Sequence, residues 1–177
     1  FRRVLFRSDG TAVVYCAVSQ FEGHHPLVIL DYDIRQIEGA LLETWLPSVF
    51  EHCEYLAGEC HAQMGSLGVW LEDKASGMVL LQQGQRRGWN TNRIDSKLTA
   101  LGKTERAISI SGYVYRNMVK LSKFAYEKTV KYKGAVRNHL LNQVLMFTVG
   151  IKDQHEDDLL DAFCYAVAIA LGNQEGF

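Results

Sequence analysis

The 177-residue chain lacks the features that define several large classes of protein. It has only two prolines, and its four cysteines form no CxxC pair. Cys53 and Cys60 lie beside histidines, but their spacing is poor for zinc, so we expect reduced thiols. No apolar run reaches the roughly 20 residues that span a bilayer, and no GxxxxGK[ST] phosphate loop is present. These absences argue against a disulfide-stapled scaffold, a zinc ribbon and a P-loop ATPase within these residues.

The charge is close to balanced overall but unevenly distributed along the chain. Residues 9–73 contain eleven acids and one base, and residues 74–137 contain fourteen bases and three acids. From residue 138 onward there are six acids and one base. A basic middle between acidic flanks suits a protein that binds phosphates with lysine and arginine and cations with carboxylates. The alternative is a solvated charged surface, which usually mixes the two signs more evenly, so we favour a polyanionic partner.

Hydrophobic periodicity predicts an α/β layer structure. The expected strands cover residues 11–19, 26–32 and 68–72, and the first two should form an antiparallel hairpin. The expected helices cover residues 38–55, 76–87, 104–110, 135–147 and 156–171, and a less regular stretch at 113–133 could hold a hairpin. Pro47 should kink or divide the first of these helices.

Three aspartates, Asp157, Asp158 and Asp161, crowd the start of the last expected helix, which is otherwise apolar. Carboxylates three or four positions apart lie side by side on a helix and repel one another. A bound divalent cation removes this repulsion, and hard cations such as Mg²⁺ prefer oxygen ligands. The alternative is helix capping, because acids favour the positive end of the helix dipole. We expect a metal site.

A second source of carboxylates follows the short strand at 68–72. Glu72 and Asp73 stand at its carboxyl end, where α/β sheets place ligands. Because side chains alternate along a strand, only one of the two can face a central site. Together with the aspartates of the last helix, this acid could complete a site with two metal ions for phosphodiester hydrolysis.

Four segments, in this order, resemble the nuclease domain of the large terminase subunit of tailed bacteriophages. They are the EDKASG run at 72–77, KTERA at 103–107, GYV at 112–114 and DDLLDA at 157–162. The resemblance runs from about residue 9 to residue 171, and its first and last motifs together are fairly specific. It implies an RNase H-like fold, a mixed β-sheet flanked by helices, that uses Mg²⁺ or Mn²⁺ to cut DNA concatemers during genome packaging. The implied partners are double-stranded DNA, an ATPase motor domain, a portal and a small terminase subunit, in the host cytoplasm and without a membrane.

The resemblance also implies roles for individual acids. Glu72, Asp158 and Asp161 would be catalytic and would bind the metal ions. Asp157 is an alternative ligand, since the double aspartate leaves the choice open, and His155 is a further ligand or proton carrier. The family's earlier aspartate is absent here, and Asp9, in a Ser-Asp-Gly-Thr-Ala context, matches only its second element and is expected at the edge of the metal site.

The expected DNA-binding side chains come from two parts of the basic middle segment. The resemblance suggests that Lys74, Lys103 and Arg106 face DNA or support the site. The alternative is that they form ion pairs with nearby acids. Composition alone suggests the strip from 116 to 137, with seven bases, one acid and two interleaved tyrosines. Its expected DNA-binding members are Lys128, Lys131 and Lys133.

The first eight residues, FRRVLFRS, resemble the translation of a common sequencing adapter. We therefore expect residues 1–8 to be non-native, the first strand to be truncated or replaced there, and the nuclease domain to cover 9–177. Two alternatives stay open. One is a Holliday-junction resolvase or another RNase H-like nuclease, because the closing helix resembles theirs too. The other is a catalytically impaired DNA-binding or assembly module.

Overall fold

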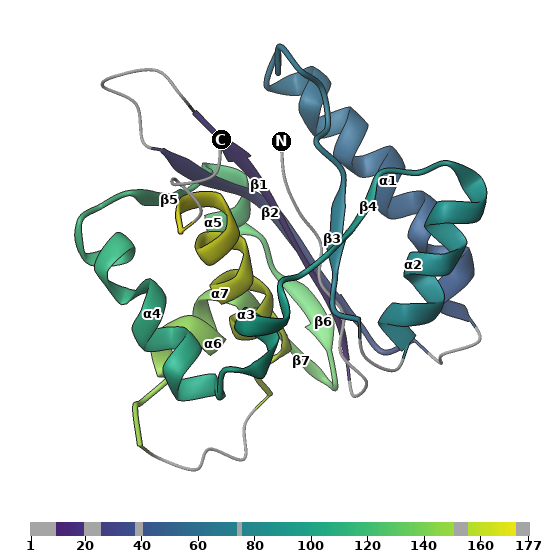
Figure 1. Ribbon diagram of the computed structural model, residues 1–177. Coiled ribbons are helices and arrows are strands. Elements are labelled where there is room, and N and C mark those ends of the chain that lie inside the picture. Colours follow the sequence, from purple (N-terminus) through teal and green to yellow (C-terminus); the bar gives the residue numbers. More distant parts are fainter. Residues whose placement is uncertain (1–9, 20–25, 38–40, 74–75, 151–155, 173–177) are drawn as a thin grey trace.

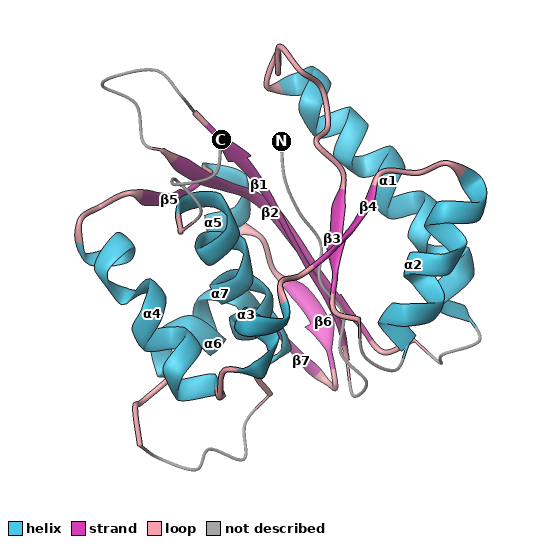
Figure 2. Cartoon of the chain, viewed as in Figure 1, coloured by secondary structure: helices cyan, strands magenta, loops and turns pink. Residues whose placement is uncertain are grey.

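The computed structural model describes residues 10–19, 26–37, 41–73, 76–150 and 156–172. The chain contains both helices and strands, as Figure 2 shows. The strands are β1 Thr11–Val18, β2 Leu27–Arg35, β3 Val69–Leu71, β4 Thr91–Arg93, β5 Val119–Leu121, β6 Val130–Tyr132 and β7 Ala135–Arg137. The helices are α1 Leu42–Glu59, α2 Ser76–Arg87, α3 Ser96–Ala100, α4 Lys103–Tyr115, α5 Lys123–Glu127, α6 His139–Met146 and α7 Asp158–Leu171.

The longest strands form the hairpin that the sequence predicts. β1 and β2 are antiparallel from the pair Thr11 and Arg35 to the pair Val18 and Leu27, with a register shift at Tyr15. β5 adds to β2 in parallel, which gives the order β1-β2-β5. β3 and β4 form a separate parallel pair.

β6 and β7 form a second hairpin with a two-residue turn. Its turn residues, Lys133 and Gly134, have φ of 45° and 81°. Positive φ at both positions is typical of the type I′ turn that suits the twist of two-residue hairpins. The turn places Lys133 at the tip of the hairpin.

Helices cover both faces of the β1–β2 hairpin (Figure 1). Successive side chains of β1 point to opposite faces, and they divide between two hydrophobic clusters. Val14 packs with α7 in one cluster, whereas Tyr15 packs with α1 and α2 in the other. β3 alternates in the same way, since Trp70 packs against the first cluster and Leu71 belongs to the second. The molecule is therefore a β layer between two helical layers, which confirms the predicted α/β class.

Pro47 was expected to kink or divide the first helix, and the structure excludes the division, because α1 continues through Pro47. A proline cannot donate a hydrogen bond to the carbonyl four residues earlier, here that of Glu43. Gln83 of α2 donates to this carbonyl instead, at 2.9 Å. The lost bond within α1 is thus replaced by a bond between two helices.

The helix α7 comes last in the sequence but lies at the centre of the fold. Twelve of its fourteen residues are buried, whereas the sequence predicts only one buried stripe. α7 packs on β1, β2, α4 and α6. Its burial on all sides explains why nearly every one of its residues is apolar.

The expected helix at 135–147 is only partly correct, because residues 135–137 form β7 and the helix α6 begins after Asn138. The Asn138 side chain accepts a hydrogen bond from Leu141 N at 2.9 Å and so caps α6. This capping residue was the available signal for the boundary. Within the described residues, no helix is both long and apolar enough to cross a membrane.

Candidate functional site at the start of the terminal helix

Asp158 and Asp161 lie in the first turn of α7, where the helix dipole favours acids. Asp157 occupies the N-cap position, but its side chain makes no capping hydrogen bond. The backbone amides of Leu159 and Leu160 instead donate to Gln143 Oε1 of α6, at 2.8 and 3.1 Å. A neutral amide from another helix thus makes these capping hydrogen bonds, whereas the interaction with the helix dipole remains for Asp158 and Asp161.

Asp161 belongs to a buried polar network with Glu72. Both Asp161 oxygens accept hydrogen bonds from Arg106 Nη2 of α4, at 2.9 Å each. Arg106 Nη1 donates to the Tyr165 hydroxyl at 2.9 Å. That hydroxyl in turn donates to Glu72 Oε1 at 2.6 Å. The structure therefore brings Glu72 and Asp161 together through one arginine and one tyrosine.

Burial determines the electrostatics of this network. Arg106 and Asp161 are only 8% and 5% exposed. Burial alone would lower the pKa of Arg106, but the neighbouring Asp161, Tyr165 and Glu72 more than offset this effect, and the pKa is raised. Burial, and then the hydrogen bond to Glu72, raise the pKa of Tyr165, so its hydroxyl stays a donor. The guanidinium is the positive charge that offsets the two carboxylates.

Asp158 faces β1 and the second hairpin. It is buried, and a Cβ added to Gly10 would lie 2.6 Å from Asp158 Oδ2 and 2.3 Å from the Tyr132 hydroxyl. Only glycine fits where these two side chains press on the backbone. The charge of Asp158 also helps raise the pKa of Tyr132, after the larger effect of burial.

Two ion pairs flank these acids. Lys103 Nζ lies 3.1 Å from Asp157 Oδ2, and Lys133 Nζ lies 3.0 Å from Glu156 Oε1. Both pairs are partly exposed, so water and salt can reach them. The acids at the start of α7 are thus buried on one side and lie beside Lys103 and Lys133 on the other.

The fit of a metal to this arrangement is incomplete. Carboxylates from two separate elements are the right donors for Mg²⁺ or Mn²⁺. Within the part of the chain that the structure describes, however, no three His, Cys, Asp or Glu side chains group so as to hold a metal ion. Arg106 also donates hydrogen bonds to both oxygens of Asp161, so this carboxylate is already occupied by a guanidinium.

The remaining expected site residues have different surroundings. Asp9, Lys74 and His155 lie outside the described residues. Asp73 accepts a hydrogen bond from Arg93 at 3.3 Å on the protein surface. Lys131 is exposed on β6.

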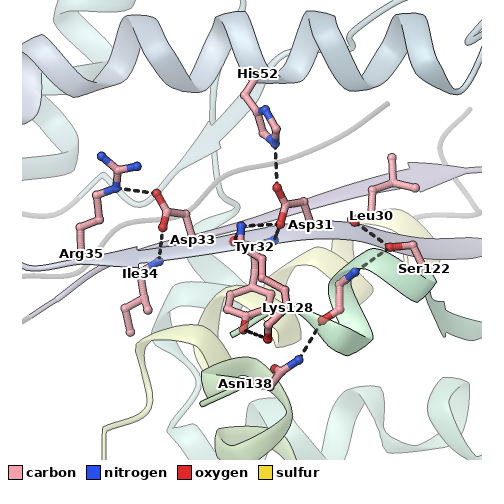
Figure 3. Close-up of polar contacts among 11 residues, drawn as sticks. Leu30, Asp31, Tyr32, Asp33, Ile34, Arg35, His52, Ser122, Lys128 and Asn138 are labelled. Carbon is pink, nitrogen blue, oxygen red and sulfur yellow. Dashed lines mark hydrogen bonds and ion pairs between the residues drawn. The ribbon is translucent and has the colours of Figure 1, made fainter. Parts of the chain in front are cut away.

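Lys128 is turned into the protein (Figure 3). Its Nζ donates to Asp31 Oδ1 at 2.7 Å and to the Tyr32 carbonyl at 2.6 Å. His52 Nε2 lies 2.7 Å from the other Asp31 oxygen. Asp31 is only 3% exposed and joins α1 and the end of α5 to β2. Lys128 therefore has a structural role in this network, in place of the expected exposed position for DNA.

The chain gives no match in comparisons with protein-family models, curated proteins and solved structures. The site must therefore be interpreted from its own chemistry.

Sequence reasoning missed three residues of the site. Tyr165 stands four positions after Asp161, which places it on the same side of α7, and this spacing was a usable signal. Gln143 and Tyr132 carry no such signal, because their partners lie far away in the sequence or at the backbone. Arg106 was expected to face DNA or support the site, and the structure shows it binding Asp161.

Proposed function

We propose that this chain is a metal-dependent DNA endonuclease domain with an RNase H-like arrangement, of the kind found in phage terminases. The observation that carries the proposal is the convergence of Glu72 from the end of β3 with Asp161 of α7 on one buried network. Asp158 lies one helical turn from Asp161 in the same buried helix start. Asp157 makes no capping hydrogen bond, and charged side chains are rarely buried unless they are paired or functional.

In this proposal Glu72, Asp158 and Asp161 hold Mg²⁺ or Mn²⁺, with Asp157 as the alternative ligand. The ions would supply an activated water and charge stabilisation for phosphodiester hydrolysis. Tyr165 and Arg106 act as positioning residues, because they fix the rotamers of Glu72 and Asp161. Double-stranded DNA would be the substrate, and Lys103 and Lys133 would face it beside the acids.

The wider context is part of the same proposal. An ATPase motor, a portal and a small terminase subunit would be the partners, and the host cytoplasm the location. A second candidate is a DNA-binding or assembly module that does not cut. The observation that favours it is that Arg106 takes both oxygens of Asp161.

Plasmid nicking with Mg²⁺ or Mn²⁺ separates the two candidates. Asp158→Asn and Glu72→Gln should lower the nicking rate by more than the roughly 10–100-fold that loss of an outer-shell partner costs a metal site. DNA affinity should stay the same or rise slightly, because one negative charge near the phosphates is lost.

Asp73→Asn is the matched control, since Asp73 follows Glu72 directly but pairs with Arg93 on the surface. It should keep full activity. Nicking that survives both Asp158→Asn and Glu72→Gln would rule out the acid site, and a wild-type chain that binds DNA without nicking it would support the non-cutting module.

A further inference from the structure

A basic hollow lies beside the acid cluster, between the β6–β7 hairpin, α6 and the start of α7. Its volume is about 320 Å³, close to the lower end of ligand pockets. Three cationic side chains line it, from α4, the hairpin tip and β7: Lys103, Lys133 and Arg137. Tyr132 and Phe147 provide aromatic walls. The hollow therefore combines positive charge with surfaces that suit a nucleotide.

A buried donor without an acceptor also lines this hollow. Gln143 is 8% exposed, and its Oε1 is taken by the two backbone amides of α7. Its orientation is thereby fixed, and Nε2 has no hydrogen-bond partner. A buried polar group left unpaired costs about 1–3 kcal/mol, so such groups usually have a partner. An oxygen of a bound anion would supply the missing acceptor.

The cations of the hollow are only partly neutralised. Lys103 and Lys133 pair with Asp157 and Glu156 at 3.1 and 3.0 Å. Among the described residues, no carboxylate lies within ion-pair distance of Arg137. Three positive and two negative side chains leave one excess positive charge. Carboxylates at partly exposed sites are readily exchanged for a phosphate, which offers more acceptor oxygens.

We propose that this hollow binds one backbone phosphate of a DNA strand, held by Lys103, Lys133, Arg137 and Gln143 Nε2. The inference rests on the proposed function and names the place where the substrate strand lies. The phosphate takes the place of Asp157 and Glu156 as the partner of the two lysines. Because the ligand is an anion, this binding needs no divalent metal.

Oligonucleotide binding in EDTA tests the phosphate contact. Arg137→Gln removes a cation that lines the hollow, and Lys97→Gln is the matched control, since Lys97 is exposed on α3 and does not line the hollow. Each lost phosphate contact lowers the slope of log affinity against log salt by about 0.9. Between 50 and 200 mM salt, the wild type should therefore lose about 3.5-fold more affinity than Arg137→Gln. Lys97→Gln should follow the wild type, and equal slopes for Arg137→Gln and the wild type would overturn the proposal.

The side-chain amide of Gln143 gives a direct readout by NMR. Its resonance should move when the oligonucleotide is added in EDTA, and inorganic phosphate at matched ionic strength should move it in the same direction. Both movements should be weaker in Arg137→Gln. A resonance that moves with inorganic phosphate but not with the oligonucleotide would show a site for free phosphate and overturn the proposal, as would no movement with either.

These outcomes are independent of cleavage, because EDTA removes the metal. A chain that binds phosphate in the hollow but never nicks DNA would count against the endonuclease alone. A chain that nicks DNA without movement of the Gln143 resonance would count against the hollow alone.

Discussion

Replacing Arg106 by glutamine should destabilise the protein strongly, because the substitution leaves the Asp161 carboxylate buried without its counter-charge. Arg106 donates twice to Asp161 and once each to Tyr165 and the Leu101 carbonyl. Removing one member of a buried ion pair costs about 3–5 kcal/mol. We expect the free energy of unfolding at pH 7 to fall by about this amount in Arg106→Gln.

The double variant with Asp161→Asn separates charge from packing. Neutralising both members removes the unpaired charge, so the double variant should regain most of the stability that Arg106→Gln loses. Urea unfolding followed by circular dichroism measures all four proteins of this cycle. A loss below about 1 kcal/mol for Arg106→Gln, the range of an exposed pair, would refute the argument that this pair is buried and structural.

Magnesium adds a test of the proposed site within the same cycle. If Asp161 is a metal ligand, the cation can replace the guanidinium, so Mg²⁺ should stabilise Arg106→Gln more than the wild type. The added stability follows RT ln(1 + [Mg²⁺]/Kd), about 2.7 kcal/mol at a hundredfold excess over Kd. Calcium-free sodium chloride at equal ionic strength is the control. An equal effect of Mg²⁺ on both proteins would mean that the site does not bind it through Asp161.

Two further predictions concern the stability of the fold. A Cβ at Gly77 would lie against the Glu72 carbonyl, so Gly77→Ala should lower the free energy of unfolding by about 1–3 kcal/mol. A Cβ at Gly112 in α4 would meet nothing within 4 Å, so Gly112→Ala should leave stability unchanged or raise it by up to about 1 kcal/mol. Thermal unfolding measures both variants. Lys128→Met should cost about 1–3 kcal/mol of stability, because it removes a donor from the buried Asp31. It should leave the salt slope of DNA binding unchanged, and a lower slope would return Lys128 to the DNA-binding surface.

Local patterns predicted the elements well where burial is one-sided or complete. The β1–β2 hairpin follows from β-branched residues around a turn, and α7 from its apolar periodicity. The strand before Glu72 was visible from its short apolar run. The boundary between β7 and α6 was missed, because a helical pattern at 135–147 hides a capping asparagine at residue 138.

For the candidate site, the sequence predicted which acids take part but not which residues they bind. The spacing of Asp158 and Asp161 places both on one helix start, and the strand before Glu72 places that acid at the end of β3. The sequence could not show that Arg106 binds Asp161 rather than projecting toward a ligand, because the pairing joins residues 55 positions apart. The same holds for Lys128 and Asp31, which are 97 positions apart. Such partners depend on tertiary packing, and composition alone does not reveal them.

The bond from Gln83 to the Glu43 carbonyl has a consequence for how the helical layer assembles. Pro47 leaves that carbonyl without a partner inside its own helix, so α1 is incomplete until α2 docks against it. A docking shifted by one helical turn would move Gln83 away by about 5.4 Å and break this bond between the helices. The proline therefore favours the alignment of the two helices in which Gln83 reaches the Glu43 carbonyl. A residue that usually interrupts helices thus makes α1 depend on a hydrogen bond from its neighbouring helix α2.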